Sequence, residues 1–304
     1  MRVFVDEFSS LDPALMDRQF RVTDDPEEAD FWVYFSTYRH PTPPNRSIIV
    51  MNEPPLAPHR IKLYGDHGGF HSFYGFMRRP WVLGDFSNTS NPMVFPYHSR
   101  WAESVVRSTT ALGDRTIYYA GSRYGFEQMP DYPGCVNLYG PRAGIVERFL
   151  EDYPSMVVRG SGWDVDTKTG EPDGAWRQRK WAEIAECNAA FVFALENCRC
   201  PNYVSEKLHD AFLTDRVALY LGSPTVSELV PAEAYVDLSP YFNPKTKWFH
   251  TRQLRERLLT MSQEEYDGII AAARRYRFGL TDEAYRLARA TLTHHVILRI
   301  QGLL

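Results

Sequence analysis

The sequence contains no long hydrophobic run, few cysteines and no marked excess of either charge. No stretch approaches the roughly 20 consecutive apolar residues that a membrane-spanning helix needs, and the first residues do not form a secretory signal. The net charge of −4 provides no basic excess for binding the phosphates of nucleic acid. We therefore expect a soluble, cytoplasmic protein whose partners are small or neutral molecules.

The cysteines also exclude some kinds of site. There are four of them, at Cys135, Cys187, Cys198 and Cys200. They are too few and too irregularly spaced for a structural zinc site, and the last two are closer together than in a C-x-x-C clip. The nine histidines are scattered along the chain. We expect free thiols and no metal site built from these residues.

The first part of the chain alternates apolar runs with polar, helix-like segments. With 304 residues, 44% of them hydrophobic, the chain is long enough for two domains of ordinary size. The pattern predicts strands at Arg2–Val5, Phe31–Phe35 and Ser47–Met51, with a helical turn at Asp24–Ala29. Strands that alternate with helices indicate a mainly parallel sheet. We place this first α/β domain at residues 1–112, ending in a linker at Ser108–Asp114.

The second part repeats the alternation and predicts a doubly wound domain at residues 113–280. Its predicted strands are Thr116–Ala120, Met156–Val158, Phe191–Leu195, Val217–Leu221 and Ala234–Leu238. Its predicted helices are Gly144–Tyr153, Ala175–Cys187 and Tyr203–Leu213. The tail, Thr251–Ile300, predicts three helices, of which the last, Thr281–Ile300, has Thr281 as its expected cap. We set residues 281–304 apart from the second domain as a C-terminal helix.

The most informative stretch is Phe191–Pro231, in which a strand, a polar loop, a helix and a second strand follow one another. Glu196-Asn197 end the first strand abruptly, and we expect both side chains to face water or a ligand. Lys207 lies in the first turns of the helix, where it is unfavourable for the helix dipole but well placed for an anion held at the helix N-terminus. This arrangement suggests a phosphate group.

The same stretch resembles the donor-binding motif of the α-1,3-fucosyltransferases, which use GDP-fucose. The matching positions are Glu196, Asn197, Tyr203, Val204, Ser205, Glu206 and Lys207, followed by the strand Val217–Leu221 and the turn Gly222-Ser223-Pro224. The resemblance implies two Rossmann-like domains that face each other across a cleft, an arrangement called GT-B, with additional C-terminal helices. It implies an inverting transferase of glycosyltransferase family 10 that moves L-fucose from GDP-β-L-fucose to a glycan hydroxyl in α-1,3 or α-1,4 linkage.

The resemblance also implies roles for particular residues. Glu53 ends a predicted strand in Asn52-Glu53-Pro54-Pro55, and the family's proposed general base lies at the end of a similar strand. Taken by itself, Glu53 is more simply an exposed loop acid before a rigid turn. Such a base would take the proton of the acceptor hydroxyl.

The leaving pyrophosphate needs positive charge, and the resemblance assigns this task to Lys207 and an arginine. Arg142 is the better match for the arginine, and Arg123 competes with it, because the segment Tyr124–Leu138 resembles an insertion relative to the family. The resemblance implies no essential metal and no cofactor besides the donor.

Four further residues are candidate donor contacts. Glu206 is a catalytic candidate that contacts donor hydroxyls or stabilises positive charge at the anomeric carbon. Tyr203 is a candidate cover for ribose or base, or a packing residue; Asn197 is a candidate donor contact, or a turn former. The resemblance adds Ser205 to the donor-binding residues.

Several alternatives remain open from the sequence. Asp164-Val165-Asp166 is a D-x-D that in other glycosyltransferases holds a divalent metal, although aspartates near glycines are common in turns. The chain could be a related transferase with another nucleotide sugar, or an inactive glycan-binding homologue. Basic residues in the last helix suggest a peripheral membrane contact or, more simply, a solvated face; they are Arg286, Arg289, His294, His295 and Arg299. The acceptor is an oligosaccharide or glycoconjugate that no motif names.

Overall fold

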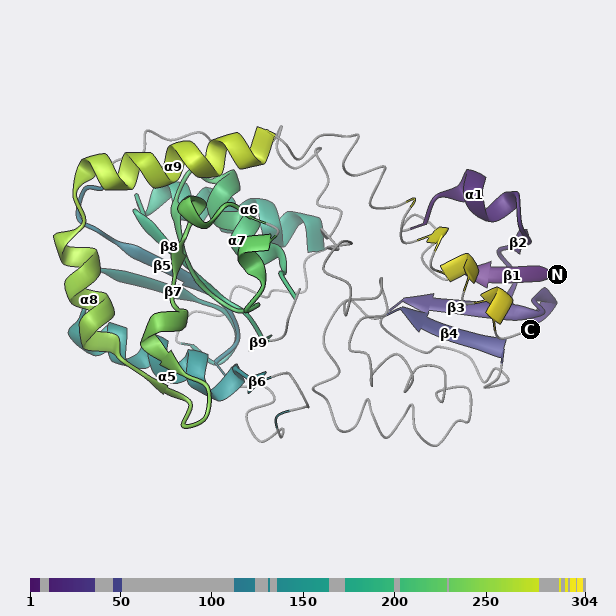
Figure 1. The fold of residues 1–304 in the computed structure, drawn as a ribbon, viewed down its shortest axis with the longest axis horizontal. Helices are drawn as coiled ribbons and strands as arrows, with labels where there is room; N and C mark the ends of the chain where they lie inside the picture. The colour runs from purple at the N-terminus through teal and green to yellow at the C-terminus, as the bar shows by residue number, and fades with distance from the viewer. Residues whose placement is uncertain are drawn as a thin grey trace. The chain divides into compact units, whose positions relative to one another are not determined.

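The structure is a computed structural model that divides the chain into two compact units, residues 1–96 with 282–304 and residues 97–281. It describes residues 1–5, 11–35, 46–50, 112–123, 131, 136–163, 173–199, 203–228 and 230–278, together with 290, 293–294, 296–298 and 300–302. Each unit contains its own parallel sheet (Figure 1). The predicted α/β class is therefore confirmed for both.

The sheet of the first unit has four parallel strands in the order β2-β1-β3-β4. Its elements are β1 (Arg2–Val5), α1 (Pro13–Asp17), β2 (Arg21–Thr23), the 3-10 turn η2 (Pro26–Glu28), β3 (Phe31–Phe35) and β4 (Ser47–Val50). The predicted strands at β1, β3 and β4 are confirmed, and each consists mainly of β-branched or aromatic residues. The sequence analysis missed β2 and α1, which have three and five residues and are too short to show a period.

The core of the first unit includes residues from the far end of the chain. Val3, Phe31 and Val33 pack in one cluster with Val296, Ile297 and Ile300. The backbone N–H of Asp12 donates to Thr293 Oγ1 at 2.7 Å, and the Asp12 carboxylate caps α1. The C-terminal helical residues, set apart in the sequence analysis, therefore complete the core of this unit.

We predict that Ile300→Ala destabilises the protein by about 2–5 kcal/mol, because the truncation leaves a cavity where Ile300 is fully buried. Leu298→Ala is the matched control, since Leu298 is 51% exposed and its loss should change the free energy of unfolding by about 0.5 kcal/mol or less. Urea denaturation of the two variants makes the comparison. Equal effects would show that the C-terminal residues do not belong to this core.

The second unit contains a five-stranded parallel sheet in the order β11-β10-β8-β5-β7. The strands are β5 (Ile117–Ala120), β7 (Met156–Arg159), β8 (Phe191–Leu195), β10 (Val217–Leu221) and β11 (Val236–Asp237). Counted along the chain this is the doubly wound order 2-1-3-4-5, which reverses between β5 and β8. All residues of β8 and β10 are buried, as expected for strands covered on both faces.

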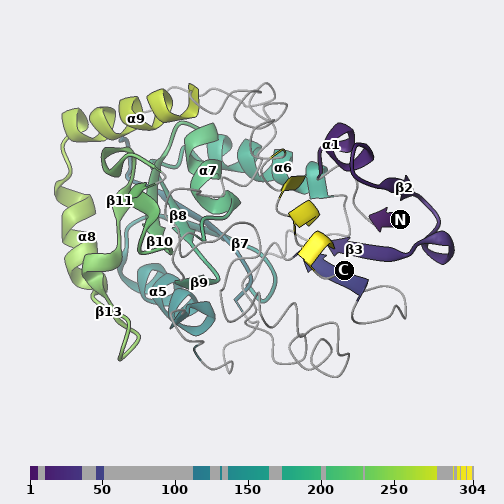
Figure 2. The same cartoon turned by 45° about the vertical axis from the view of Figure 1, so that its right-hand side comes forward.

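Helices cover both faces of this sheet (Figures 1 and 2). One face packs on α5 (Tyr139–Asp152) and α8 (Thr251–Thr260), and the other on α6 (Asp173–Glu186) and α7 (Glu206–Leu213). The long α9 (Gln263–Phe278) contributes residues to both clusters. Alternate strand residues separate accordingly, with Phe191 and Phe193 on the α5 side and Val192 on the α7 side.

Short elements complete the second unit. They are β6 (Val136–Asn137), β9 (Cys198–Arg199), η4 (Val226–Glu228), η5 (Ala232–Ala234), η6 (Ser239–Tyr241), β12 (Phe242–Asn243) and β13 (Trp248–Phe249). Cys187 and Cys198 are free thiols as expected, and the other two cysteines lie outside the described residues. Among the described helices, none has the length and apolar character needed to span a bilayer.

Two helix starts differ from the predictions by three residues or more. Helix α5 begins at Tyr139, five residues before the predicted start at Gly144. The prediction was late because the pair Gly140-Pro141 is typical of a break in a helix. Proline is tolerated in the first turn of a helix, where the backbone N–H groups have no partner within the helix. Helix α7 begins at Glu206, after the N-cap Ser205 and not at Tyr203. Both corrections concern residues of the candidate site.

Candidate functional site

The carboxyl ends of β5 and β8 flank the point at which the strand order of the second unit reverses. In doubly wound sheets, ligands bind in the crevice beyond this point. Gly121-Ser122 follows β5, Glu196-Asn197 follows β8, and Gly222-Ser223 follows the neighbouring β10. Three polar or glycine-containing strand ends therefore lie along one edge of the sheet.

The side chain of Arg142 forms hydrogen bonds with residues at the ends of both strands that flank the reversal of strand order. Its Nη1 donates to Asn197 Oδ1, and its Nη2 donates to Ser122 Oγ at 2.9 Å. The guanidinium lies 4.2 Å from the centre of the Tyr139 ring, and only 2% of Arg142 is exposed. The Nε of Arg142 has no hydrogen-bond partner among the described residues. A buried cation with a spare donor thus lies where a doubly wound sheet places its ligand.

Backbone pairing keeps this arginine beside the β8 end. Strand β6, just before α5, pairs antiparallel with β9, so that Asn137 lies opposite Cys198. The Leu138 N–H donates to the Asn197 carbonyl at 3.1 Å, and Asn137 Oδ1 accepts from the Tyr139 N–H at 3.0 Å. The early start of α5 therefore follows directly from a ladder that fixes Arg142 against Asn197.

The N-terminus of α7 is held by a buried carboxylate. Ser205 is the N-cap of the helix, and its hydroxyl accepts from the Lys207 N–H at 3.4 Å. The Ser205 N–H donates to Glu196 Oε1 at 2.6 Å, and the Ser205 hydroxyl donates to Glu196 Oε2. Glu196 is completely buried. The prediction that its side chain faces water or a ligand is therefore wrong: the carboxylate lies under the start of α7.

The Lys207 ammonium lies close to two carboxylates at this helix start. Its Nζ lies 3.1 Å from Ser205 Oγ, 3.2 Å from Glu206 Oε1 and 3.7 Å from Glu196 Oε2. The side chain of Lys207 is 13% exposed and that of Glu206 is 24% exposed. Both reach the surface, whereas Glu196 does not. An anion at the helix N-terminus would meet the Lys207 ammonium and backbone N–H groups, with the Glu206 carboxylate beside the ammonium.

Burial raises the pKa of Glu196 to about 7, although Lys207 and the two hydrogen bonds from Ser205 lower it. The side chain also packs closely against a neighbouring strand end. A Cβ added at Gly222 would lie 2.4 Å from Glu196 Cγ and 2.4 Å from the Tyr220 hydroxyl. Glycine is therefore required at this strand end, because the Glu196 side chain and the Tyr220 ring pack directly against its backbone.

The remaining predicted residues lie in different surroundings. Arg123 forms an ion pair with Glu147 at 2.9 Å and lies over the Trp163 ring, 5.2 Å from its centre. Tyr203 is only 4% exposed, and its carbonyl accepts from the Tyr220 hydroxyl at 3.3 Å. The predicted base Glu53 and the aspartates of Asp164-Val165-Asp166 lie outside the described residues. Within the described part of the chain, no group of three or more His, Cys, Asp or Glu residues could hold a metal.

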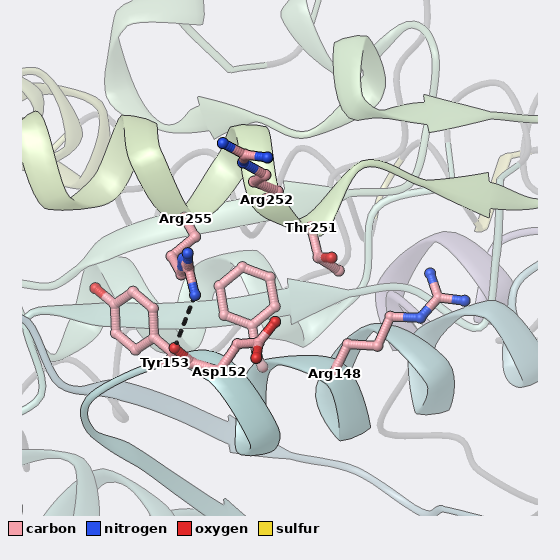
Figure 3. A pocket seen from close by; sticks show the side chains of 7 residues that line it. Arg148, Asp152, Tyr153, Thr251, Arg252 and Arg255 are labelled. Carbon is pink, nitrogen blue, oxygen red and sulfur yellow. Dashed lines mark hydrogen bonds between the residues drawn. The ribbon is translucent and has the colours of Figure 1, made fainter.

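A small pocket lies elsewhere on this unit, between α5 and α8 (Figure 3). Arg255 donates to the Asp152 carbonyl at 3.2 Å across it, and Arg148 and Arg252 contribute to its wall. The Tyr153 hydroxyl, also in its wall, donates to the Arg115 carbonyl just before β5. The pocket therefore lies toward the amino ends of β5 and β7, away from the carboxyl ends that carry the candidate site.

Residues 164–267 match the family model described as glycosyltransferase family 10 (fucosyltransferase), C-terminal part. A stretch of 94 residues is 26% identical to Alpha-(1,3)-fucosyltransferase C of Drosophila melanogaster. The resemblance to the fucosyltransferase family is confirmed. The family match spans about a third of the chain and includes β8, α7 and β10, but not Arg142. The stretch matched to the Drosophila protein is 31% of this chain and only 20% of that protein.

Solved structures give a remoter similarity. A crystal structure of an alpha1,3-fucosyltransferase is 12% identical with a TM-score of 0.41, covering 89% of this chain and 80% of that one. A crystal structure of an alpha1,3-fucosyltransferase with GDP-fucose is 14% identical with a TM-score of 0.40, covering 89% and 81%.

The sequence analysis did not identify Glu196 as a buried partner of Ser205, nor Ser122 as a partner of Arg142. Two features of the sequence could have indicated the role of Glu196. It directly follows a fully apolar strand, and a serine suited to cap a helix comes nine residues later. Ser122 lies just after the predicted strand Thr116–Ala120, at the edge where a ligand is expected, but no pattern indicated its contact with Arg142, which joins positions that are 20 residues apart.

We predict that Glu196→Gln removes a pH dependence of stability. The pKa of about 7 in the folded protein exceeds the usual value of about 4.3 for an unfolded glutamate. Glu196 therefore favours the folded state at low pH, and this contribution is lost as the pH rises through 7. The stability of Glu196→Gln relative to wild type should increase by on the order of 2 kcal/mol between pH 5 and pH 8.

Urea denaturation at several pH values measures this difference. Glu183→Gln is the matched control, because it removes one carboxylate from α6 of the same unit, outside the candidate site. A difference between Glu196→Gln and wild type that does not change with pH would contradict the prediction.

Proposed function

We propose that this chain transfers L-fucose from GDP-β-L-fucose to a hydroxyl of a glycan acceptor, with inversion at the anomeric carbon and in α-1,3 or α-1,4 linkage. The observation that carries the proposal is the start of α7, where the Lys207 ammonium lies beside the helix N-terminus, within the segment that matches the fucosyltransferase family. Pyrophosphate is the anion of a nucleotide sugar, and helix N-termini are common sites for it.

The chemistry requires one base and several groups that accept negative charge. In the proposed reaction, Glu53 takes the proton of the acceptor hydroxyl, and the hydroxyl oxygen forms a bond to the anomeric carbon. The bond from that carbon to the β-phosphate oxygen breaks, and GDP leaves with the electron pair. Lys207, Arg142 and the N–H groups of α7 stabilise the charge that develops on the pyrophosphate.

The surroundings of the two arginines support Arg142 for this role. Arg142 lies at the reversal of strand order and makes neutral contacts with Asn197 and Ser122, so that its charge is not cancelled by them. Arg123 has Glu147 as its partner. We propose that Lys207 and Arg142 supply the positive charge without a metal, and that Glu206 and Asn197 contact the sugar or the ribose.

We predict that Lys207→Ala weakens the binding of GDP-fucose by about 10- to 100-fold, because the pyrophosphate loses a charge-assisted hydrogen bond. Arg142→Lys should also weaken it, by about tenfold, since lysine keeps the charge but not the planar set of N–H donors. Arg123→Ala should change the dissociation constant by no more than about threefold. Calorimetric titration of the purified variants gives these values.

The exposed Lys245, in the turn between β12 and β13, provides a control for the loss of one positive charge. Lys245→Ala should bind GDP-fucose as wild type does. A larger loss of affinity in Arg123→Ala than in Arg142→Lys would reverse the assignment of the arginines, and unchanged binding by Lys207→Ala would contradict the proposed phosphate site.

A transfer assay tests the whole proposal. Wild-type protein with GDP-fucose and a panel of oligosaccharides should release GDP and form a fucosylated product, whose linkage and anomeric configuration NMR spectroscopy identifies. We predict that Glu53→Ala lowers the transfer rate by about 10²- to 10⁴-fold while the affinity for GDP-fucose stays unchanged, because a general base acts only on the acceptor hydroxyl.

Glu233→Ala is the control for this variant, because Glu233 is an exposed acid of the second unit. Transfer at the wild-type rate by Glu53→Ala would reject Glu53 as the base. Donor binding without transfer to any acceptor would favour an inactive glycan-binding homologue, and transfer from a different nucleotide sugar would favour a related transferase.

A further inference from the structure

Glu196 has no part in the proposed reaction, yet it contacts the residues that receive the donor. Its two carboxylate oxygens accept from the N–H and the hydroxyl of Ser205, and Oε2 lies 3.7 Å from Lys207 Nζ. The side chain is completely buried, so it touches neither water nor any ligand that binds at the surface. Glu196 can act on a ligand only through Ser205 and Lys207.

A buried carboxylate lowers the stability of the folded protein compared with a well-packed apolar side chain. Ionised carboxylates lose their hydration on burial, and hydrogen bonds and a nearby cation only partly replace it. The site nevertheless packs closely around this group, since even a Cβ added at Gly222 would lie only 2.4 Å from Glu196 Cγ. Because the buried charge is unfavourable and yet closely packed, we infer that it has a role that a neutral, apolar residue could not fill.

The task follows from the contacts. Ser205 must present its hydroxyl to the N–H of Lys207 in order to cap α7, and a hydroxyl that donates to Glu196 is held with its lone pairs free for that N–H. The Lys207 ammonium lies between Ser205 Oγ, Glu206 and Glu196, which limits the positions that its flexible side chain can take. An ordered ammonium and an ordered cap give an anion site that needs little rearrangement on binding.

We propose that ionised Glu196 is a positioning residue that fixes Ser205 and Lys207 in the arrangement that binds the pyrophosphate of the donor. The inference rests on the proposed binding of a nucleoside diphosphate sugar at α7. It adds to that function a requirement for a charged group which the donor does not contact.

The charge of Glu196 depends on pH within the physiological range, because burial raises its pKa to about 7. The charged and titratable groups around it are Lys207 and Glu206 from α7 and the Tyr220 hydroxyl from β10. Tyr220 stays protonated, because burial raises its own pKa well above 10. Loss of the Glu196 charge at low pH would release Lys207 and weaken the hold on Ser205.

The test is the affinity for GDP-fucose as a function of pH. GDP-fucose suits this test because its pyrophosphate is esterified at both ends and keeps a constant charge between about pH 6 and pH 8. Wild-type protein should bind GDP-fucose about five- to tenfold more tightly at pH 8 than at pH 6. Glu196→Gln should bind at the low-pH level of wild type throughout this range, without an inflection near pH 7.

Glu183→Gln is again the matched control and should keep the wild-type profile. The wild-type profile alone already tests the proposal, so a variant that fails to fold does not prevent a decision. Affinity that is independent of pH in wild type, or an inflection retained in folded Glu196→Gln, would overturn the positioning role. So would tighter binding by Glu196→Gln at pH 8, which would show that Glu196 only competes with the donor for Lys207. Absence of GDP-fucose binding at every pH would instead reject the proposed function.

Discussion

The contact between the Glu196 carboxylate and the first turn of α7 is the interaction on which the candidate site depends. It connects the carboxyl end of β8 with the N-cap of the helix, and both oxygens of the carboxylate are used by Ser205. Because Gly222 at the end of β10 packs against the same side chain, three elements meet at one buried charge. The position of Lys207 at the surface follows from this buried contact.

The topology of the sheet supplies the second constraint. The strand order reverses between β5 and β8, and doubly wound sheets bind their ligands beyond the carboxyl ends of the strands at such a point. Arg142 lies across this edge, with Ser122 on one side and Asn197 on the other. Helix α5 must start early for Arg142 to reach this position, and the β6–β9 ladder provides the means. A positive side chain and a helix N-terminus thus lie at one end of the sheet.

The strands and the chemical character of the site could be predicted from the sequence, since both depend on local patterns. Phe191–Leu195 and Val217–Leu221 are continuous apolar runs, and their predicted bounds equal the observed ones. The polar residues that follow these strands, and the helix start at Ser205-Glu206-Lys207, can be identified from patterns that are only a few residues long. What could not be predicted depends on contacts between distant positions: the packing of Ile300 on the first sheet and the ladder that starts α5 at Tyr139. The buried state of Glu196 belongs to the same class, because a carboxylate after a strand ordinarily faces solvent.

Calorimetric titration of the wild-type protein with GDP-fucose, GDP-mannose, UDP-galactose and free GDP, each with EDTA and again with manganese, tests the central claim most directly. The account predicts that GDP and GDP-fucose bind equally well with and without the metal, because Lys207 and Arg142 supply the positive charge. Binding confined to UDP-galactose in the presence of manganese would contradict it and would direct attention to Asp164-Val165-Asp166.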